Sequence, residues 1–356
     1  MEIKTLGELC NIVSGGTPLR SKPEYWNNGT IPWIKIGDMK GKYINSADEC
    51  ITQAGLDSSS AKMLPKGTIL YTIFATLGEV GILEINASTN QAIAGLTIKD
   101  NSQILSEYLY YYLKSKKGYV KTIGRGVAQS NINMSILKSF QVPLPTFLKQ
   151  KEIVDILDKI TNIIKYRQQE LHMLDNLIKA RFVEMFGDCK ELITLKDLCS
   201  IITDGTHQPP QFQDSGIPFI LVSNLSQNTV TYDTKKYISE ETYNELIKRT
   251  PIEVGDVLLS TVGSYGHPAV VTNDKKFLFQ RHIAYLKPKR DIVNSFYLHG
   301  ALLAPDAQRQ IEEKVKGIAQ KTLNLSEIKK IVIPIPSIEC QNAFEQFVAQ
   351  VDKSKF

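Results

Sequence analysis

The chain has 356 residues, of which 42% are hydrophobic and 22% are charged, a composition that fits a globular protein with room for two domains. Its net charge of +5 does not by itself identify a nucleic-acid-binding protein, and its five cysteines contain no CxxC pair of the kind that zinc sites use. The N-terminus carries charges, and no uncharged apolar run reaches the length of a membrane span. We therefore expect a cytoplasmic protein with reduced thiols and no metal site.

A pattern of about 140 residues occurs twice, so an internal duplication is the first structural prediction. The offset between matching residues stays between 186 and 191 along the whole pattern. A duplicated fold whose copies have unrelated uses is the simpler alternative. The matching positions are Leu6, Leu9, Cys10, Ile12, Gly16 and Thr17 with Leu195, Leu198, Cys199, Ile201, Gly205 and Thr206, and residues 31–34, 67–70, 126–129 and 142–145 with 217–220, 255–258, 317–320 and 333–336.

The first copy, residues 1–147, is predicted to be a compact α+β domain. Short runs of strand-forming residues such as 67–74 are bounded by Gly, Pro and Asn, which favour turns. Near its end, the apolar residues of 108–113 follow helix spacing. We expect strands first and a helix last.

Residues 148–187 are predicted to form a spacer helix between the copies, because neither Gly nor Pro interrupts 148–186. Its apolar residues alternate at steps of four and three, the spacing of a coiled-coil seam with Arg167 and Arg181 as polar breaks. Such a helix would be about 58 Å long at 1.5 Å per residue. The apolar seam is Ile153, Leu157, Ile160, Ile164, Leu171, Leu174, Ile178 and Met185.

The second copy, residues 188–336, repeats the strand runs at 255–262 and turns helical at 296–303. Basic residues between 275 and 290 flank a predicted pair of strands. We expect a second α+β domain of the same fold.

A short second spacer helix is expected at 337–356, where Phe344, Val348 and Val351 repeat the start of the seam. Aligned in parallel at an offset of 191, it leaves part of the first seam uncovered, and an antiparallel pairing would move the uncovered part to the other end. An exposed stripe seeks partners, so we expect self-association or cover by another subunit. The uncovered residues in the parallel alignment are Leu171, Leu174, Ile178 and Met185.

No catalytic motif is found. The Gly-x-Gly at 124–126 lacks a third glycine, and the chain has no Walker motif. Gln-Pro-Pro-Gln at 208–211 does not match the D/N/S-P-P-aromatic element of amino-methyltransferases, and residues 263–266 are not a hydrolase nucleophile elbow. We expect no catalysis by this chain.

The end of the first copy is basic. No acidic residue occurs from 108 to 151, while eight lysines and arginines do. Such a stretch can neutralise phosphates, although a solubilising basic face is the alternative. Residues 1–147 contain 15 basic and 11 acidic residues, and 188–336 contain 18 and 17, so phosphate attraction should be uneven.

Arg, Asn and Gln carry forked hydrogen-bonding ends that read base edges in the major groove. Such residues lie in 126–133 and recur in the second copy, although asparagines that satisfy turn backbones are the competing interpretation. The candidate DNA contacts are Lys114, Lys116, Lys117, Lys121, Arg125, Gln129, Asn131 and Asn133, then His207, Lys275, Lys276, Arg281, Lys316, Gln320, Lys321 and Asn324.

At these motifs the sequence resembles the specificity subunits of type I restriction-modification systems, over essentially the whole chain. It departs from that family in its shortened C-terminal helix. The residues that carry the resemblance are Gly-Gly-Thr-Pro at 15–18, Tyr25-Trp26, Ile-Pro-Trp-Ile at 31–34, Gly-Asp-Met at 37–39, residues 126–133, 142–145 and 150–152, and Thr-Asp-Gly-Thr-His at 203–207 with Pro209.

The resemblance implies two tandem target-recognition domains that read a two-part site in double-stranded DNA, with the helices setting the gap. It further implies two separate modification subunits that bind S-adenosylmethionine and methylate adenine. A restriction subunit would use ATP and Mg to translocate and cleave foreign DNA in host defence, and this chain itself would bind no cofactor. A stand-alone DNA methyltransferase or nuclease and a tandem-domain protein adaptor are the alternatives.

Overall fold

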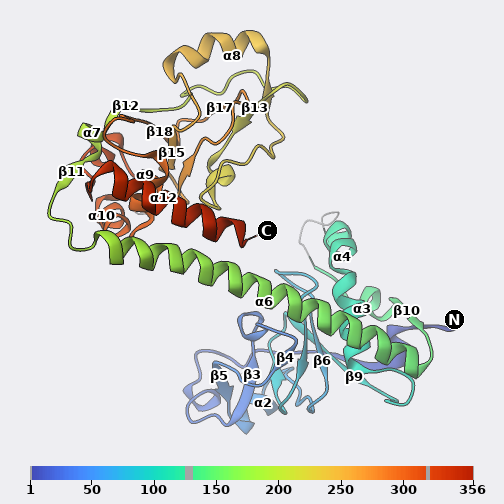
Figure 1. The fold of residues 1–356 in the computed structure, drawn as a ribbon. Helices are drawn as coiled ribbons and strands as arrows, with labels where there is room; N and C mark the ends of the chain where they lie inside the picture. The colour runs from blue at the N-terminus through green and yellow to red at the C-terminus, as the bar shows by residue number, and fades with distance from the viewer. Residues whose placement is uncertain (1, 125–130, 318–320, 356) are drawn as a thin grey trace. The chain divides into compact units, whose positions relative to one another are not determined.

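The computed structural model describes residues 2–124, 131–317 and 321–355, with the backbone alone at 121, 123 and 124 (Figure 1). Its contacts divide the chain into unit one, Met1–Tyr166, and unit two, Arg167–Phe356. None of the helices in the described ranges is long and apolar enough to cross a membrane. The mixed helix and sheet content agrees with the α+β prediction.

Unit one is built on a five-stranded sheet in the order β2-β9-β6-β7-β4. Its central strands β6 and β7 are buried along their whole length. A second sheet has the order β5-β3-β8, and the first strand pairs antiparallel with the last in the ribbon β1-β10. The strands are β1 (Glu2–Thr5), β2 (Cys10–Ser14), β3 (Ile31–Ile34), β4 (Tyr43–Ile44), β5 (Glu49–Ile51), β6 (Ile69–Thr72), β7 (Val80–Leu83), β8 (Ser88–Thr89), β9 (Ile93–Ile98) and β10 (Gln141–Leu144).

The longer helices of unit one follow β9. The predicted helix near residue 110 is confirmed as α3, which buries Tyr108, Leu109 and Leu113 on one face because these residues are one turn apart. The helical segments are α1 (Leu6–Leu9), the 3-10 turns η1 (Pro23–Tyr25) and η2 (Ile36–Asp38), α2 (Gln53–Asp57), α3 (Ser106–Ser115), α4 (Lys117–Gly124), α5 (Met134–Lys138) and α6 (Phe147–Phe186), the last of which continues into unit two.

Unit two repeats this plan with a sheet in the order β12-β18-β15-β16, a three-stranded sheet β14-β13-β17 and the ribbon β11-β19. Its elements are β11 (Leu192–Thr194), α7 (Leu195–Leu198), β12 (Cys199–Asp204), β13 (Ile217–Ile220), η3 (Val222–Leu225), β14 (Tyr237–Ile238), α8 (Glu240–Leu246), η4 (Ile247–Arg249), β15 (Val257–Ser260), β16 (Pro268–Val270), β17 (Leu278–Phe279), β18 (Ile283–Pro288), α9 (Ser295–Leu303), α10 (Pro305–Lys314), α11 (Leu325–Ile328), β19 (Val332–Pro334) and α12 (Ile338–Lys353).

Two strands do occur among the basic residues 275–290, but the prediction that they pair with each other is wrong. Strand β17 pairs in parallel with β13, whereas β18 pairs with β12 and β15 in the other sheet. The short connection between β17 and β18 therefore passes from one sheet to the other.

A β-bulge changes the correspondence between the two units. In β12 the register with β18 shifts between Cys199 and Ile201, whereas β2 pairs with β9 without a shift. A bulge adds one residue to one strand of a pair. Ser200 is that extra residue, so the residues of β2 beyond it and those of β9 differ from their equivalents in β12 and β18 by 190 positions and not by the 189 of the sequence comparison.

Two glycines identify the corrected correspondence. The amide of Gly15 donates to Ile93 O at 3.0 Å, and the amide of Gly205 donates to Ile283 O at 3.2 Å. A Cβ at either position would lie 2.2 Å from a backbone oxygen, so only glycine fits. The match of Gly16 with Gly205 predicted from the sequence is therefore wrong, and Gly15 is the equivalent residue.

A buried glutamine joins the start of α6 to unit one. Gln150 is fully buried, its Oε1 accepts from the amide of Leu105 at 2.9 Å, and its Nε2 donates to Gln103 O at 2.9 Å and Pro145 O at 3.0 Å. A buried amide of this kind is stabilising only when its groups are paired. These three bonds fix the first turn of the helix on its domain.

The same arrangement occurs at the start of α12 in unit two. Gln341 is fully buried, accepts from the amide of Asn294 at 2.9 Å, and donates to Ile292 O at 3.1 Å and Pro336 O at 2.9 Å. The match of Gln150 with Gln341 in the sequence therefore reflects a shared helix-anchoring contact.

Within unit two, α12 packs antiparallel to the second half of α6. Phe344, near the start of α12, contacts Phe182 near the end of α6 with ring centres 5.3 Å apart. At the other end, a terminal nitrogen of Arg167 donates to Ser354 O at 3.4 Å. The antiparallel alternative is therefore the observed one.

Because α12 runs antiparallel to α6, the uncovered part of the apolar seam lies in the first half of α6 and not in the second. The prediction that the second half of α6 is left uncovered is wrong, because Leu171, Leu174, Ile178 and Met185 are each half-buried. Within unit one, Ile153 and Leu157 are half-buried. In α12, Phe344 and Val351 are buried and Val348 is half-buried. The exposed apolar stretch instead comprises Ile156, Ile160, Ile163 and Ile164, each 47–66% exposed.

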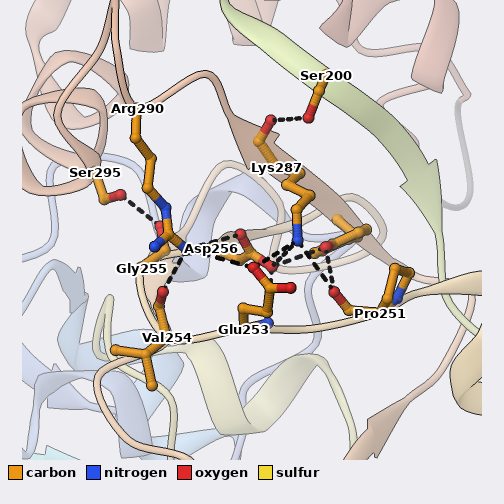
Figure 2. Close-up of polar contacts among 10 residues, drawn as sticks. Ser200, Pro251, Glu253, Val254, Gly255, Asp256, Lys287, Arg290 and Ser295 are labelled. Atoms are coloured by element: carbon orange, nitrogen blue, oxygen red, sulfur yellow. Dashed lines mark hydrogen bonds and ion pairs between the residues drawn. The ribbon is translucent and has the colours of Figure 1, made fainter.

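Unit two contains a buried carboxylate that joins a loop to its central strand (Figure 2). Asp256 is fully buried, and its Oδ2 accepts from the hydroxyl of Tyr285 at 2.7 Å and the amide of Glu253 at 2.9 Å. Lys287 Nζ lies 3.8 Å from Oδ2, and a terminal nitrogen of Arg290 lies 3.7 Å from Oδ1. Two cations thus offset the cost of burying this charge.

In unit one the equivalent positions carry uncharged residues. Because β6–β9 and β15–β18 pair in the same register, Thr68 and Thr97 are the equivalents of Asp256 and Lys287. Their hydroxyl oxygens are 3.2 Å apart, and Thr68 is almost fully buried. The charged cluster is therefore a property of unit two and not of the fold.

The buried glutamines should stabilise their own units separately. In Gln150→Leu the Leu105 amide loses its acceptor, so we expect its hydrogen exchange to accelerate by about 5- to 150-fold, or about 1–3 kcal/mol. Exchange at the Asn294 amide should not change, and Gln341→Leu should give the reverse pattern. Gln168→Leu, at an exposed position of α6, is the matched control. Acceleration at both amides in either variant would contradict this local role.

The charged cluster should make unit two sensitive to loss of one partner. Asp256→Thr leaves Lys287 without its buried counter-charge, so we expect unfolding of unit two to require about 2–4 kcal/mol less. The double variant with Lys287→Thr reproduces the neutral pair of unit one and should recover part of this loss.

Urea denaturation can assign that effect to one unit. Both tryptophans of the chain, Trp26 and Trp33, lie in unit one, so their fluorescence follows unit one while circular dichroism follows both. The fluorescence transition should be the same in all variants. Equal destabilisation in the single and double variants would show that the charge pair is not the cause.

Candidate nucleic-acid interface

The basic run of unit one lies on α3 and α4. Lys114 Nζ is 5.4 Å from the centre of the Tyr110 ring, and Lys116 Nζ is 5.3 Å from the ring of Tyr112. Lys117 is ion-paired with Glu79, whereas neither Lys114 nor Lys116 has an acidic partner in the described ranges. Lys114 and Lys116 therefore keep charges that an anionic ligand can use.

Several predicted contacts lie outside the described residues. Arg125 and Gln129 of unit one and Gln320 of unit two belong to this group, as does the side chain of Lys121. The interface is therefore built from the residues on either side of them.

A backbone contact closes the same loop in both units. After β6, Phe74 forms a bridge with Asn131, and after β15, Val262 forms a bridge with Thr322. The residue after each bridge donates to the residue before it, at 3.0 Å in unit one and 2.8 Å in unit two. We call this bridge, together with the glycine contact of Gly15 or Gly205, the shared frame.

The two asparagines next to this bridge have different surroundings. Asn133 Oδ1 accepts from the amide of Ile136 at 2.8 Å and caps α5, so the turn-satisfying interpretation is confirmed there. Asn324 occupies the equivalent position before α11, but its side chain makes no capping hydrogen bond. Its amide group is available to a ligand.

Beside the shared frame, unit two has a hollow of about 300 Å³. It lies where β12 ends, β18 begins and the segment before α11 returns to the sheet. Among the predicted DNA contacts, Arg281 and Asn324 meet here. The polar lining comprises Asp204, Thr261, Arg281, His282, Thr322 and Asn324.

An ion-pair network occupies one side of this hollow. Asp204 Oδ2 is 2.8 Å from His207 Nε2, and its Oδ1 is 2.5 Å from a terminal nitrogen of Arg249. His207, a predicted contact, is therefore tied to the hollow through Asp204. The carboxylate neutralises Arg249 and holds the histidine.

Arg281 provides a further positive charge on the hollow. It is exposed, its Nε donates to His282 Nε2 at 3.3 Å, and it has no acidic partner among the residues that can be placed. Burial, and then the charge of Arg281, lower the pKa of His282. The lowered pKa favours the neutral form of the histidine, whose Nε2 accepts from Arg281.

The other predicted lysines of unit two lie elsewhere. Lys275 and Lys276 line a separate hollow of about 270 Å³, where Lys276 is paired with Glu240. Lys321 is paired with Glu312 at 2.7 Å, and Lys316 is exposed. The structure thus places Arg281 and Asn324 at one hollow and Lys275 and Lys276 at another, while Lys316 and Lys321 line neither.

Unit one carries different side chains at the equivalents of the hollow. With the corrected offset of 190, Thr17 corresponds to His207 and Gln91 to Arg281. The hydroxyl of Thr17 donates to Gln91 Oε1, and both residues are exposed. Unit one is neutral where unit two is charged.

Sequence reasoning missed Thr17, Gln91, Asp204 and Arg249. A signal was available, because residues 90–92 and 280–282 precede the apolar runs of the central strands in the same way.

The side chains around the shared frame are suited to polar recognition. Arginine, asparagine and glutamine present forked hydrogen-bonding ends, which match base edges. No group of three or more His, Cys, Asp or Glu residues able to hold a metal ion occurs among the residues whose positions are given. The arrangement offers donors and acceptors for binding.

Known proteins share this sequence pattern. The family model described as "Type I restriction modification DNA specificity domain" matches residues 1–174 and 189–356. The type I restriction enzyme MjaIX specificity subunit of Methanocaldococcus jannaschii is 25% identical over 98% of this chain and 85% of its own length. The EcoR124I/EcoR124II specificity subunit of Escherichia coli is 31% identical over 46% of this chain and 41% of its own length.

Solved structures show the same fold. The type I restriction-modification S subunit from M. genitalium superposes with a TM-score of 0.52 at 15% identity, covering 99% of this chain and 90% of its own. A chain from a study of complex assembly and conformational transition of the type I R-M system gives 0.55 at 18% identity, with coverage of 99% and 90%. Since the family model matches both copies, the chain belongs to the family of type I restriction-modification specificity subunits.

Proposed function

We propose that this chain reads a bipartite target in double-stranded DNA, one half-site for each unit. The observation that carries the proposal is the shared frame, which has the same backbone contacts in both units but different exposed polar side chains. A duplicated frame with changed side chains is what two related readers of different sequences require.

We further infer that catalysis belongs to partner subunits. Two modification subunits would bind S-adenosylmethionine and methylate adenine, and a restriction subunit would use ATP and Mg. The specificity-subunit names of the relatives and the absence of cofactor motifs in the sequence support this division.

The spacer helix offers a surface for such partners. Exposed isoleucines between positions 156 and 164 of α6 have no apolar cover from unit one and would favour association with a modification subunit or with a second copy of the chain. At the other end of α6, Ile178 and Met185 pack against the core of unit two, in which Phe344 is fully buried. Docking through the first half of α6 is therefore favoured.

Salt dependence tests the DNA-binding proposal. In complex with modification subunits, binding to duplex DNA should weaken steeply with salt, with a log-log slope of about −0.9 for each phosphate contact. Replacing Lys114 and Lys116 with Gln should reduce the slope by up to about 1.8 and weaken binding to all sequences alike. Lys330→Gln, where the lysine is ion-paired with Glu327, is the control.

Two results would favour the alternatives. If binding of the complex to duplex DNA did not depend on salt, the result would support the alternative that the chain is a protein adaptor. Methyl transfer from S-adenosylmethionine by the purified chain alone would support a stand-alone methyltransferase.

Domain exchange tests the division into half-sites. Replacing residues 1–145 with the first domain of another family member should change one half of the methylated sequence, because each unit has its own frame and core. The other half should remain unchanged in methylome sequencing of a host that carries the complex. Simultaneous change of both halves would contradict independent reading.

A further inference from the structure

The two units present different forked side chains at one equivalent position. We propose that Gln91 and Arg281 are paired specificity-determining residues, of which Gln91 reads an adenine and Arg281 a guanine, each in the half-site of its own unit. The inference rests on the proposed DNA-reading function and names the residues that discriminate bases. Its chemical basis is that glutamine pairs with adenine and arginine with guanine through two hydrogen bonds.

The backbone shows that the two positions are equivalent. The residues before them, Asn90 and Gln280, accept from the amides of Ile93 and Ile283 at 3.2 and 3.1 Å. These isoleucines begin the central strands β9 and β18, and their own carbonyls accept from the frame glycines. Each turn also has one hydrogen bond of its own, from the Arg281 amide to Thr206 O at 3.0 Å in unit two and from the Ala92 amide to Asn90 Oδ1 at 3.1 Å in unit one. The two turns are therefore equivalent where they enter the central strand, and they carry different side chains.

Arg281 is free to make a two-pronged contact. Its one side-chain hydrogen bond in the described ranges uses Nε, so both terminal nitrogens stay unpaired there. Guanine presents two acceptors, O6 and N7, to such a fork. Arg249, by contrast, is neutralised by Asp204 at 2.5 Å. Of these two arginines, Arg281 is the one whose terminal nitrogens have no partner in the described ranges.

Gln91 has one hydrogen-bonding partner, and both ends of its amide can still bind a ligand. The hydroxyl of Thr17 donates to its Oε1, which has a second lone pair. Its Nε2 has no hydrogen-bond partner among the placed residues. The oxygen can accept from adenine N6 while the nitrogen donates to N7. Thr17 is therefore a positioning residue in unit one, at the place that His207 occupies in unit two.

Asn324 extends the recognition surface of unit two. It lines the same hollow as Arg281, and its side chain does not cap the following helix. In unit one the equivalent Asn133 uses its oxygen to cap α5. The units thus differ at a second position, and Arg281 has an additional polar neighbour that Gln91 lacks.

Reciprocal substitution tests the proposal in the complex with modification subunits. The methylated sequence of the wild-type complex is first determined by methylome sequencing. Arg281→Gln should then lower the preference for guanine at one position of one half-site by about 5- to 150-fold, and Gln91→Arg should lower the preference for adenine at one position of the other. All other positions should stay unchanged.

Conservative and distant variants separate base reading from other roles. Arg281→Lys keeps the charge but loses the fork, so it should lose guanine preference while the salt slope is retained. Arg309→Gln, on α10, and Gln103→Arg, beyond the far end of β9, are matched controls that should change neither half-site.

Each outcome has a distinct meaning. Uniform weakening for all sequences by Arg281→Gln, with guanine preference kept by Arg281→Lys, would make Arg281 a phosphate contact and overturn the assignment. An unchanged methylated sequence in both Arg281→Gln and Gln91→Arg would also overturn it. If the wild-type complex shows no sequence-specific binding or methylation, the proposed function fails first, independently of these residues.

Discussion

One buried amide in each unit determines where a spacer helix leaves its domain. Gln150 and Gln341 each satisfy one backbone donor and two backbone acceptors at the point where the first and last strands of the unit have just closed their ribbon. Because unpaired buried polar groups are costly, other side chains fit poorly there. The domain and the start of its helix are consequently one structural piece, and recognition side chains can change without altering the helix exit.

The two units share the backbone contacts of the frame but differ in the side chains at equivalent positions. The frame glycines Gly15 and Gly205 cannot be replaced, since a Cβ would meet backbone oxygen at 2.2 Å. Positions at the other end of the central strands differ even in charge: a buried Thr68 in one unit corresponds to a buried Asp256 in the other. Variation of this kind needs local compensation, which Lys287 and Arg290 provide in unit two. Exposed positions such as Gln91 and Arg281 need none, so they can change most easily.

Sequence patterns predicted the duplication, the helix α3 and the long helix α6, because each depends on local periodicity. They did not predict the bulge at Ser200, since an extra residue in a strand leaves the apolar pattern almost intact while it moves every later residue by one position. The direction of α12 was left open, because Phe344 can meet the seam from either direction, and contact with Phe182 decides between them. The equivalence of Gln91 and Arg281 is supported by the hydrogen bonds of Asn90 and Gln280 with the isoleucines that begin β9 and β18.

Charge and base recognition are assigned to different residues in this chain. Lys114 and Lys116 of unit one have no acidic partner in the described ranges, and their Nζ atoms lie 5.4 and 5.3 Å from the centres of tyrosine rings, a cation–π arrangement. Phosphate contacts of this type set orientation and affinity but carry no sequence information. With a net charge of +5, the chain can neutralise few phosphates. In the proposed function, affinity for DNA would therefore come largely from partner subunits, and side chains such as Gln91 and Arg281 would discriminate bases.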